Sequence, residues 1–249
     1  MPLTRPSCVL ALLGVVFAAS IVTAQPPPPR TERVAFAAGA SSAAIKGQLK
    51  GDDTIDYLVK AAAGQTITVT LAPTNKMTSF NVLPPGSADV AMYVADGTPS
   101  YKGRLPADGD YKVRVYLIRA AARRGAATSY ALTIGVTGAP LAPLSGAVDA
   151  KVAGTQAHAT ASTPCVPMPY VDTKPTTCEA AVIRRAGSAA TVIVSLGTAG
   201  KRHLLFEKGA VTATDAAEVP TTTRKGDLTV VTFPSGERHE IPDAFVLGG

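Results

Sequence analysis

Residues 110–117 read DYKVRVYL and residues 129–136 read SYALTIGV, and these two stretches decide the fold. In each of them every second residue is apolar, which is typical of a strand with one buried face. The stretch QTITVTL at residues 65–71 has the same pattern, with threonines between its apolar residues. No stretch of useful length has helical periodicity. We therefore predict that this half of the chain is all-β.

Turn-forming residues separate the predicted strands of the first half. Asp108-Gly109-Asp110 precedes one of them, and Pro84-Pro85-Gly86 interrupts the middle of the module. Short strands with such turns between them favour two antiparallel sheets packed face to face. We predict an N-terminal antiparallel β-sandwich, jelly-roll-like, over residues 32–138.

The second half repeats the strand pattern in a different sequence. Residues 190–196, 203–207 and 227–233 read as strands, with turns at residues 225–227 and 234–236. Residues 137–146, TGAPLAPLSG, are rich in proline and glycine, which suits a linker. We place the linker at residues 139–146 and a second small β-rich domain at residues 147–249.

The N-terminus has the features of a secretory signal peptide at residues 1–24. A short basic start precedes an apolar, uncharged run at residues 8–22, and Val-Thr-Ala comes directly before Gln25. A membrane anchor needs about 20 apolar residues, and this run stops short of a proline-rich leader at residues 25–31. We expect a periplasmic or secreted protein without a membrane span after cleavage.

Cysteine and histidine usage points to a disulfide. Of the 3 cysteines, Cys8 lies in the predicted signal peptide, which leaves Cys165 and Cys178. In an oxidising compartment we expect these two to pair, stabilising the second domain by roughly 3 kcal/mol. Because the 3 histidines have no metal-ligand spacing, we predict no metal site.

Charge does not favour a nucleic-acid partner. The chain has a net charge of +6 and no tryptophan, and its lysines and arginines are scattered. A nucleic-acid binder gathers its cations on one face beside stacking aromatics. Weak attraction to an anionic cell surface stays open.

The sequence contains no motif that indicates an enzyme or a cofactor. There is no Gly-x-Ser-x-Gly, His-Glu-x-x-His, phosphate-binding loop or dinucleotide fingerprint. We interpret His239, in the charged segment at residues 237–240, as a surface polar residue without a catalytic partner. Asp52, Asp53 and Asp56 could be paired carboxylates, but as residues flanking a strand start they read as turn residues.

The segment RAAARR at residues 119–124 lies between two predicted strands. A single helical turn there would place Arg119 and Arg123, four positions apart, on one side. Two adjacent guanidiniums can grip carboxylates bidentately, as plugging an acidic cleft requires. The alternatives are a solvated hairpin loop, or arginines whose aliphatic stems cover the end of the sandwich.

Motifs spread over residues 34–136 carry a resemblance to a known family. They are Val34-Ala35-Phe36, Ile45-Lys46-Gly47, Lys50-Gly51 with Tyr57, Ala63-Gly64-Gln65, Leu83-Pro84-Pro85-Gly86, residues 105–111 (LPADGDY), and Arg114-Val115 through Arg119, Arg123 and Tyr130. With this order and spacing, residues 31–138 resemble the periplasmic inhibitors of g-type (goose-type) lysozyme, secreted β-sandwich proteins of Gram-negative bacteria. The region also resembles the C-terminal sandwich domains of secreted peptidases.

The resemblance implies a partner and a binding site. In the inhibitor family an arginine pair enters the lysozyme cleft, and Arg119 and Arg123 fall on those positions. Each would be an interface hot spot of roughly 2 kcal/mol or more. The family commonly has tyrosine where this chain has Asp52, and an anionic side chain there disfavours an acidic cleft.

Two functions therefore remain open from the sequence. The first is an exported inhibitor of g-type lysozyme, which blocks the muramidase cleft with an arginine-bearing loop. The alternative is a non-catalytic accessory module that binds a cell-wall or envelope component, a carbohydrate or a protein. The second domain has no counterpart in the inhibitors, and its sequence does not choose between these functions.

Overall fold

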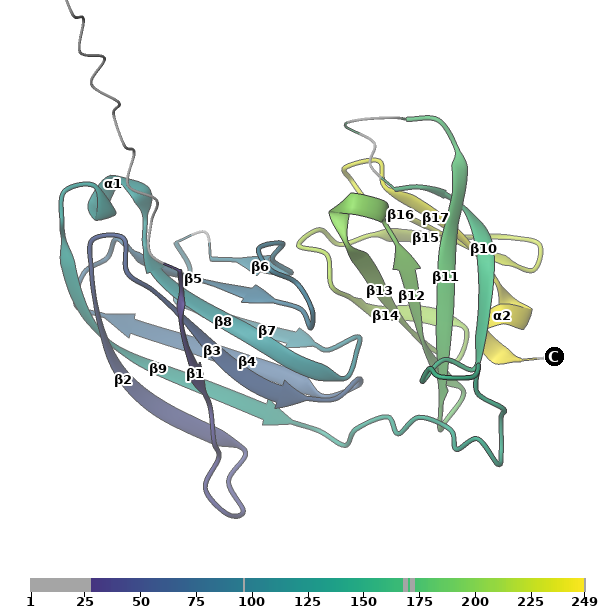
Figure 1. The fold of residues 1–249 in the computed structure, drawn as a ribbon, viewed down its shortest axis with the longest axis horizontal. Helices are drawn as coiled ribbons and strands as arrows, with labels where there is room; N and C mark the ends of the chain where they lie inside the picture. The colour runs from purple at the N-terminus through teal and green to yellow at the C-terminus, as the bar shows by residue number, and fades with distance from the viewer. Residues whose placement is uncertain (1–27, 96, 168–169, 171–172, 249) are drawn as a thin grey trace, which may run out of the picture.

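The structure is a computed structural model that describes residues 28–95, 97–167, 170 and 173–248. It consists of two β-rich modules that follow one another along the chain (Figure 1), as the sequence predicts. The predicted signal peptide at residues 1–24 lies outside the described residues. Within the described ranges, no helix is long and apolar enough to span a membrane.

The first module is a sandwich of two sheets (Figure 1). One sheet has the order β1 (Arg30–Arg33), β3 (Thr54–Ala61), β8 (Gly109–Leu117), β5 (Thr78–Leu83) and β6 (Tyr93–Val94). The other has the order β2 (Ser42–Lys50), β9 (Ala127–Thr137), β4 (Thr66–Pro73) and β7 (Ser100–Arg104). Strands β4, β8 and β9 confirm the strands predicted here. β1 begins inside the segment that the sequence assigns to the proline-rich leader.

Alternate side chains of these strands meet between the two sheets. Val113 and Val115 of β8 and Leu132 and Ile134 of β9 are fully buried. Burying such a side chain stabilises the fold by about 1.5–3 kcal/mol. The two-residue period of the sequence is therefore the period of this shared core.

Asp56 corrects one prediction, because it is not a turn residue. Asp52 and Asp53 do lie between β2 and β3, but Asp56 lies within β3 and is 5% exposed. Arg114 on the neighbouring strand β8 donates to both its oxygens, from Nε at 2.7 Å and Nη2 at 2.9 Å. These hydrogen bonds raise the pKa of Arg114. A carboxylate is tolerated inside the strand because this guanidinium neutralises it.

The second module is one eight-stranded sheet that curls around its own core (Figure 1). Its order is β14 (Ala210–Thr214), β13 (Lys201–Glu207), β12 (Ala189–Ser195), β11 (Thr176–Arg185), β10 (Ala159–Val166), β17 (Arg238–Pro242), β16 (Leu228–Thr232) and β15 (Thr221–Lys225). The 3-10 helix η1 (Gly197–Ala199) joins β12 to β13, and α2 (Asp243–Leu247) follows β17. Phe245 and Val246 of α2 pack into the core.

The prediction that His239 is a surface residue is wrong. His239 lies within β17, is 0% exposed, and its Nε2 is 2.8 Å from Glu237 Oε1. Arg202 on β13 donates to both oxygens of Glu237, at 2.8 Å each. His158 and His203 are buried as well. The charged sequence around His239 resembles a turn, but β17 pairs with β10 on one side and with β16 on the other, which makes it an internal strand.

The two modules are joined by a buried arginine. Arg185 of β11 is fully buried and donates to both carboxylate oxygens of Asp108 in the first module, at 3.2 and 2.9 Å. It also donates to the carbonyl oxygen of Leu141 at 2.7 Å and to Thr191 Oγ1 at 2.9 Å. Thr191 in turn donates to the carbonyl oxygen of Pro106 at 2.8 Å. These bonds dock the modules against each other.

The segment between β9 and β10 contacts both modules. The amide of Leu141 donates to Ala63 of the first module and the amide of Leu144 to Arg184 of the second, both at 2.9 Å. The placement of the domain boundary at residues 139–146 stays a prediction. What the contacts establish is that this segment is held at both ends.

The Arg185 junction predicts a large cost for Asp108→Asn. The substitution leaves a fully buried guanidinium without its anion, but Asp108 itself is 40% exposed, so solvent screening should reduce the loss in the free energy of unfolding to about 2 kcal/mol. Denaturant unfolding of the mature chain measures this. Asp110→Asn is the matched control, since its pair with Arg33 is exposed on both sides and should cost less than about 1 kcal/mol. Equal costs for the two variants would contradict the assignment.

The buried Glu237 predicts a loss of stability in acid. Burial alone would raise its pKa, but hydrogen bonds from Arg202 and His239 outweigh burial and lower the pKa from 4.5 to about 2. The stability that ionised Glu237 contributes is therefore complete above pH 4.5 and is lost as the pH falls towards about 2.

Glu237→Gln should remove this dependence on pH. Denaturant unfolding between pH 5 and pH 2 should show a loss on the order of 3 kcal/mol in the wild type beyond that of the variant. The exposed Glu32→Gln is the control and should follow the wild type. If the free energy of unfolding depends on pH in the same way for the wild type and Glu237→Gln, ionised Glu237 does not contribute this stability.

Candidate functional site

The connection between β8 and β9 forms a short helix, one of the conformations that the sequence left open for residues 119–124. Helix α1 (Arg119–Ala122) follows Ile118, and Arg123 keeps a helical backbone, with its amide 3.1 Å from the carbonyl oxygen of Arg119. Gly125 then takes a φ of 64°, a left-handed conformation that ends a helix readily because glycine has no Cβ. Arg119 and Arg123 are thus one helical turn apart, and both are exposed.

Apolar side chains fix this loop to the end of the sandwich. Ala121 and Ala122 are buried against Leu117, and Ile118 and Met77 pack on the same cluster. The amide of Ile118 donates to the carbonyl oxygen of Met77 at 2.9 Å. With this side of α1 facing inward, its arginines are left on the solvent side.

The β2–β3 turn that contains Asp52 lies beside α1. The amide of Gly51 donates to the carbonyl oxygen of Ala126 at 2.8 Å, and a Cβ on Gly51 would lie 3.7 Å from the carbonyl oxygen of Ala122. Asp53 closes the turn by accepting the amide of Lys50 at 3.0 Å. Asp52 is exposed at its tip. The structure therefore brings Asp52 to the same end of the sandwich as the two arginines.

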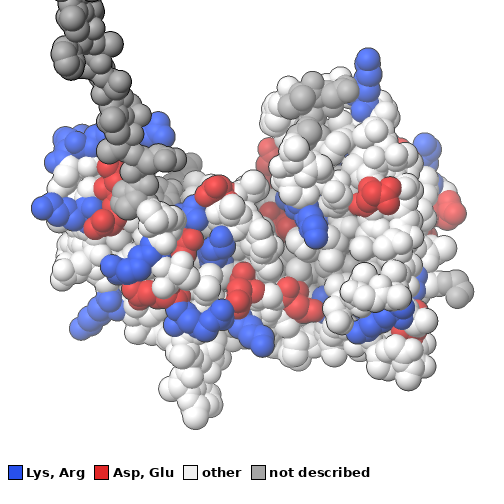
Figure 2. Space-filling model, viewed as in Figure 1, with Lys and Arg blue, Asp and Glu red and all other residues white. Residues whose placement is uncertain are grey.

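The arginines of this loop differ from the others in the described part of the chain. Arg119, Arg123 and Arg124 have no side-chain hydrogen bond or ion pair to any described residue, whereas every other described arginine has a carboxylate partner. Figure 2 shows lysine and arginine side chains gathered at the end of the first module where Figure 1 has α1. The loop presents guanidiniums whose hydrogen-bonding capacity is unused.

Arg124 is the residue that sequence reasoning did not single out. It belongs to the same RAAARR segment, and its amide donates to the carbonyl oxygen of Ala121 at 3.1 Å. The doubled arginine at the end of the segment was the available signal. The argument from a spacing of four positions applies to Arg119 and Arg123, and it does not apply to Arg124.

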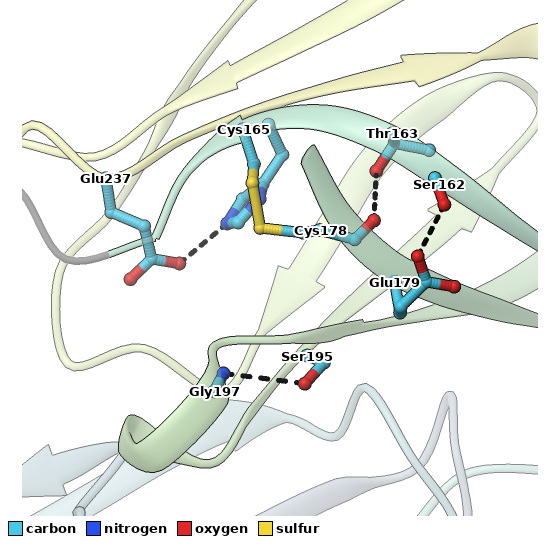
Figure 3. Close-up of a disulfide and its surroundings, with 9 residues drawn as sticks. Ser162, Thr163, Cys165, Cys178, Glu179, Ser195, Gly197 and Glu237 are labelled. Carbon is cyan, nitrogen blue, oxygen red and sulfur yellow. Dashed lines mark hydrogen bonds and ion pairs between the residues drawn. A yellow bond between two sulfur atoms is a disulfide. The ribbon is translucent and has the colours of Figure 1, made fainter. Parts of the chain in front are cut away.

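The predicted disulfide is confirmed in the second module. Cys165 of β10 and Cys178 of β11 are joined by an S–S bond, drawn in Figure 3. Both are buried in the core of that module, and Cys165 is also paired in register with His239 of β17. The bond therefore links β10 to β11 beside the buried pair of His239 and Glu237. It lies in the second module, whereas α1 lies in the first.

Among the described residues, no three His, Cys, Asp or Glu side chains are grouped so that they could hold a metal ion. Nothing at the α1 loop combines a nucleophile with a base. The arrangement there suits recognition of carboxylates by guanidinium groups.

Solved structures of lysozyme inhibitors are similar to this chain. PliG of Aeromonas hydrophila, a periplasmic inhibitor of g-type lysozyme, is 40% identical, with 98% of that protein and 44% of this chain covered and a TM-score of 0.43. PliG of Salmonella Typhimurium, another periplasmic inhibitor of g-type lysozyme, is 31% identical, with 98% of it and 43% of this chain covered and a TM-score of 0.36.

The identity of 40% extends over nearly the whole length of the Aeromonas protein. The chain belongs to this inhibitor family. The resemblance predicted from residues 31–138 is thus confirmed, and the prediction of a protein that is not an enzyme agrees with a family whose named members are inhibitors. More than half of the chain lies outside the match. The matched part is about as long as one of the two modules.

Other comparisons add little to this assignment. The predicted wider resemblance also finds a counterpart, the pre-peptidase C-terminal domain of collagenase from Bacillus anthracis, at 17% identity over 45% of this chain and all of that one, with a TM-score of 0.32. No protein-family model matches the chain, and no curated protein matches it.

Proposed function

We propose that this protein is an exported, periplasmic inhibitor of g-type lysozyme, and that its α1 loop blocks the cleft of that enzyme. The observation that carries the proposal is the set of unpaired guanidiniums of Arg119, Arg123 and Arg124 in a chain whose other described arginines are paired. The relatives named above, which inhibit g-type lysozyme, support the identity of the partner.

The chemistry of the loop suits an acidic cleft. A guanidinium donates two parallel hydrogen bonds to a carboxylate, which gives both strength and orientation. The backbone of α1 is already fixed by its buried alanines, so binding costs little conformational entropy there. Arginines in such a preorganised position, desolvated at the centre of an interface, are typical hot spots.

Asp52 opposes this binding. Its carboxylate lies at the tip of the turn beside α1 and has no ion pair within the described residues. A cleft whose carboxylates attract the arginines also repels this side chain. We infer that Asp52 weakens inhibition without preventing it, because the arginines of α1 outnumber the carboxylates of this turn, Asp52 and Asp53.

Removal of the two arginines should abolish inhibition. With Arg119→Ala plus Arg123→Ala, the lost pairs should raise the inhibition constant by a factor of 100 or more, at roughly 2 kcal/mol for each arginine. Lysis of a cell-wall suspension by g-type lysozyme, followed by turbidity, measures this.

The control for this experiment removes two charges elsewhere on the first module. Lys46→Ala plus Lys102→Ala changes exposed strand residues that belong neither to α1 nor to the Asp52 turn, and this variant should inhibit like the wild type. Lysozyme of the c-type, run in parallel, tests the choice of enzyme. If the wild-type chain leaves g-type lysozyme fully active at large excess, the proposed function is wrong.

Neutralising Asp52 should strengthen inhibition. Asp52→Asn keeps the size of the side chain and removes its charge, so the inhibition constant for g-type lysozyme should fall by roughly 2- to 5-fold, the worth of an exposed charge contact. Asp227→Asn, at an exposed turn of the second module, is the matched control. Weaker inhibition by Asp52→Asn would mean that the carboxylate contributes to binding.

A further inference from the structure

A second site lies in the cleft between the two modules, away from α1. The loop between β5 and β6, residues 84–90, forms one wall, and residues 196–203 form the other. Figure 2 shows the surface hollowed between the modules, and Figure 1 shows the β5–β6 loop beside the second module. The cleft has a volume of about 760 Å³, within the usual range for a small-ligand site.

His203 is the residue that points to a ligand in this cleft. It lines the cleft from β13, is 8% exposed, and its Nδ1 lies 2.5 Å from Asp215 Oδ2. Asp215 is 1% exposed and is held by the amide of His203 at 2.9 Å and by Arg202 at 3.1 Å. The carboxylate accepts the hydrogen bond from Nδ1, so Nε2 is the acceptor atom of the ring in its neutral form. Nε2 has no hydrogen-bond partner among the described residues.

The charges at the floor of the cleft nearly balance. Arg202 is placed between Glu237 and Asp215 and lies over the ring of Phe233, at 5.1 Å from its centroid. Two carboxylates face one guanidinium, and the exposed Lys201 adds a positive charge at the rim. A third carboxylate, the exposed Asp89 of the opposite wall, is paired with Arg114 at 2.9 Å. The described lining therefore carries one surplus negative charge, which disfavours an anionic ligand.

The walls of the cleft combine apolar surface with hydroxyl groups. Pro84, Pro85 and Leu196 supply apolar surface, and Thr198 supplies a hydroxyl on η1. A ligand that suits these walls has apolar faces as well as groups that both donate and accept hydrogen bonds. Sugars have this combination, because their C–H faces are apolar and their hydroxyls donate and accept.

We propose that the cleft between the modules binds a neutral oligosaccharide, one of whose hydroxyls donates to His203 Nε2. Metal binding does not compete, since the described residues contain no group of three ligands. The inference goes beyond lysozyme inhibition, because none of the cleft residues belongs to α1 or to the Asp52 turn. It gives the second module, which lies outside the inhibitor match, a role of its own.

The test is a titration of the ¹⁵N-labelled mature chain with two neutral probes, the N-acetylglucosamine tetramer and maltotetraose. At least one probe should shift the side-chain ¹⁵N resonances of His203 together with the amides of residues 84–90 and 196–203, and calorimetry should give its Kd. The proposal is wrong if neither probe binds, or if the shifts map outside the cleft.

Variants separate binding in the cleft from effects on the fold. Thr198→Trp fills the cleft from an exposed position and leaves the His203–Asp215 pair whole, so the Kd should rise at least tenfold. Thr223→Trp, at an exposed position of β15, is the control and should bind like the wild type. His203→Gln removes the ring acceptor and should also weaken binding. Unchanged affinity in Thr198→Trp would overturn the proposal.

The two proposed sites can be tested independently. Arg119→Ala plus Arg123→Ala should bind the oligosaccharide with unchanged Kd, and Thr198→Trp should inhibit g-type lysozyme like the wild type. Failure of the sugar site therefore leaves the inhibitor assignment standing, and the reverse also holds. Loss of sugar binding in the double arginine variant would show that the probe binds at α1 instead.

Discussion

Burial of alternate side chains of β8 and β9 between the two sheets fixes where β8 ends and where β9 begins. Leu117 is the last buried residue of β8, and the chain must then turn within a few residues to return as β9. The apolar cluster continues into the turn through Ile118, Ala121 and Ala122. Packing of these residues determines which side of α1 faces the protein. Arg119 and Arg123 are exposed because Ala121 and Ala122, which lie between them in the sequence, are buried.

Electrostatic pairing explains why this loop stands out. Elsewhere arginines stabilise the structure, as Arg114 does inside the first module, Arg185 between the modules and Arg202 inside the second. A guanidinium with all its partners in place has little left to offer a ligand. Those of α1 are available, and the nearby turn holds two carboxylates, Asp53, which maintains the shape of the turn, and Asp52 at its tip.

The sequence predicted those features that depend on local pattern. Strands with a two-residue period follow from neighbours in the chain, and the disulfide follows from the cysteine content. The helical turn of α1 was one of several conformations that the sequence left open. Asp56 and His239 were misread because their burial depends on Arg114 and Arg202, which lie 58 and 35 positions from their carboxylate partners. The cleft could not be predicted either, since docking of the modules by Arg185 brings its two walls together.

Hydrogen exchange of the mature chain, with and without an equimolar amount of g-type lysozyme, tests whether α1 and the neighbouring turn form the surface that meets this enzyme. Exchange should slow in residues 118–126 and 50–53, with the rest of the sheets and the second module unchanged. Protection confined to the second module, or no protection anywhere, would contradict this assignment.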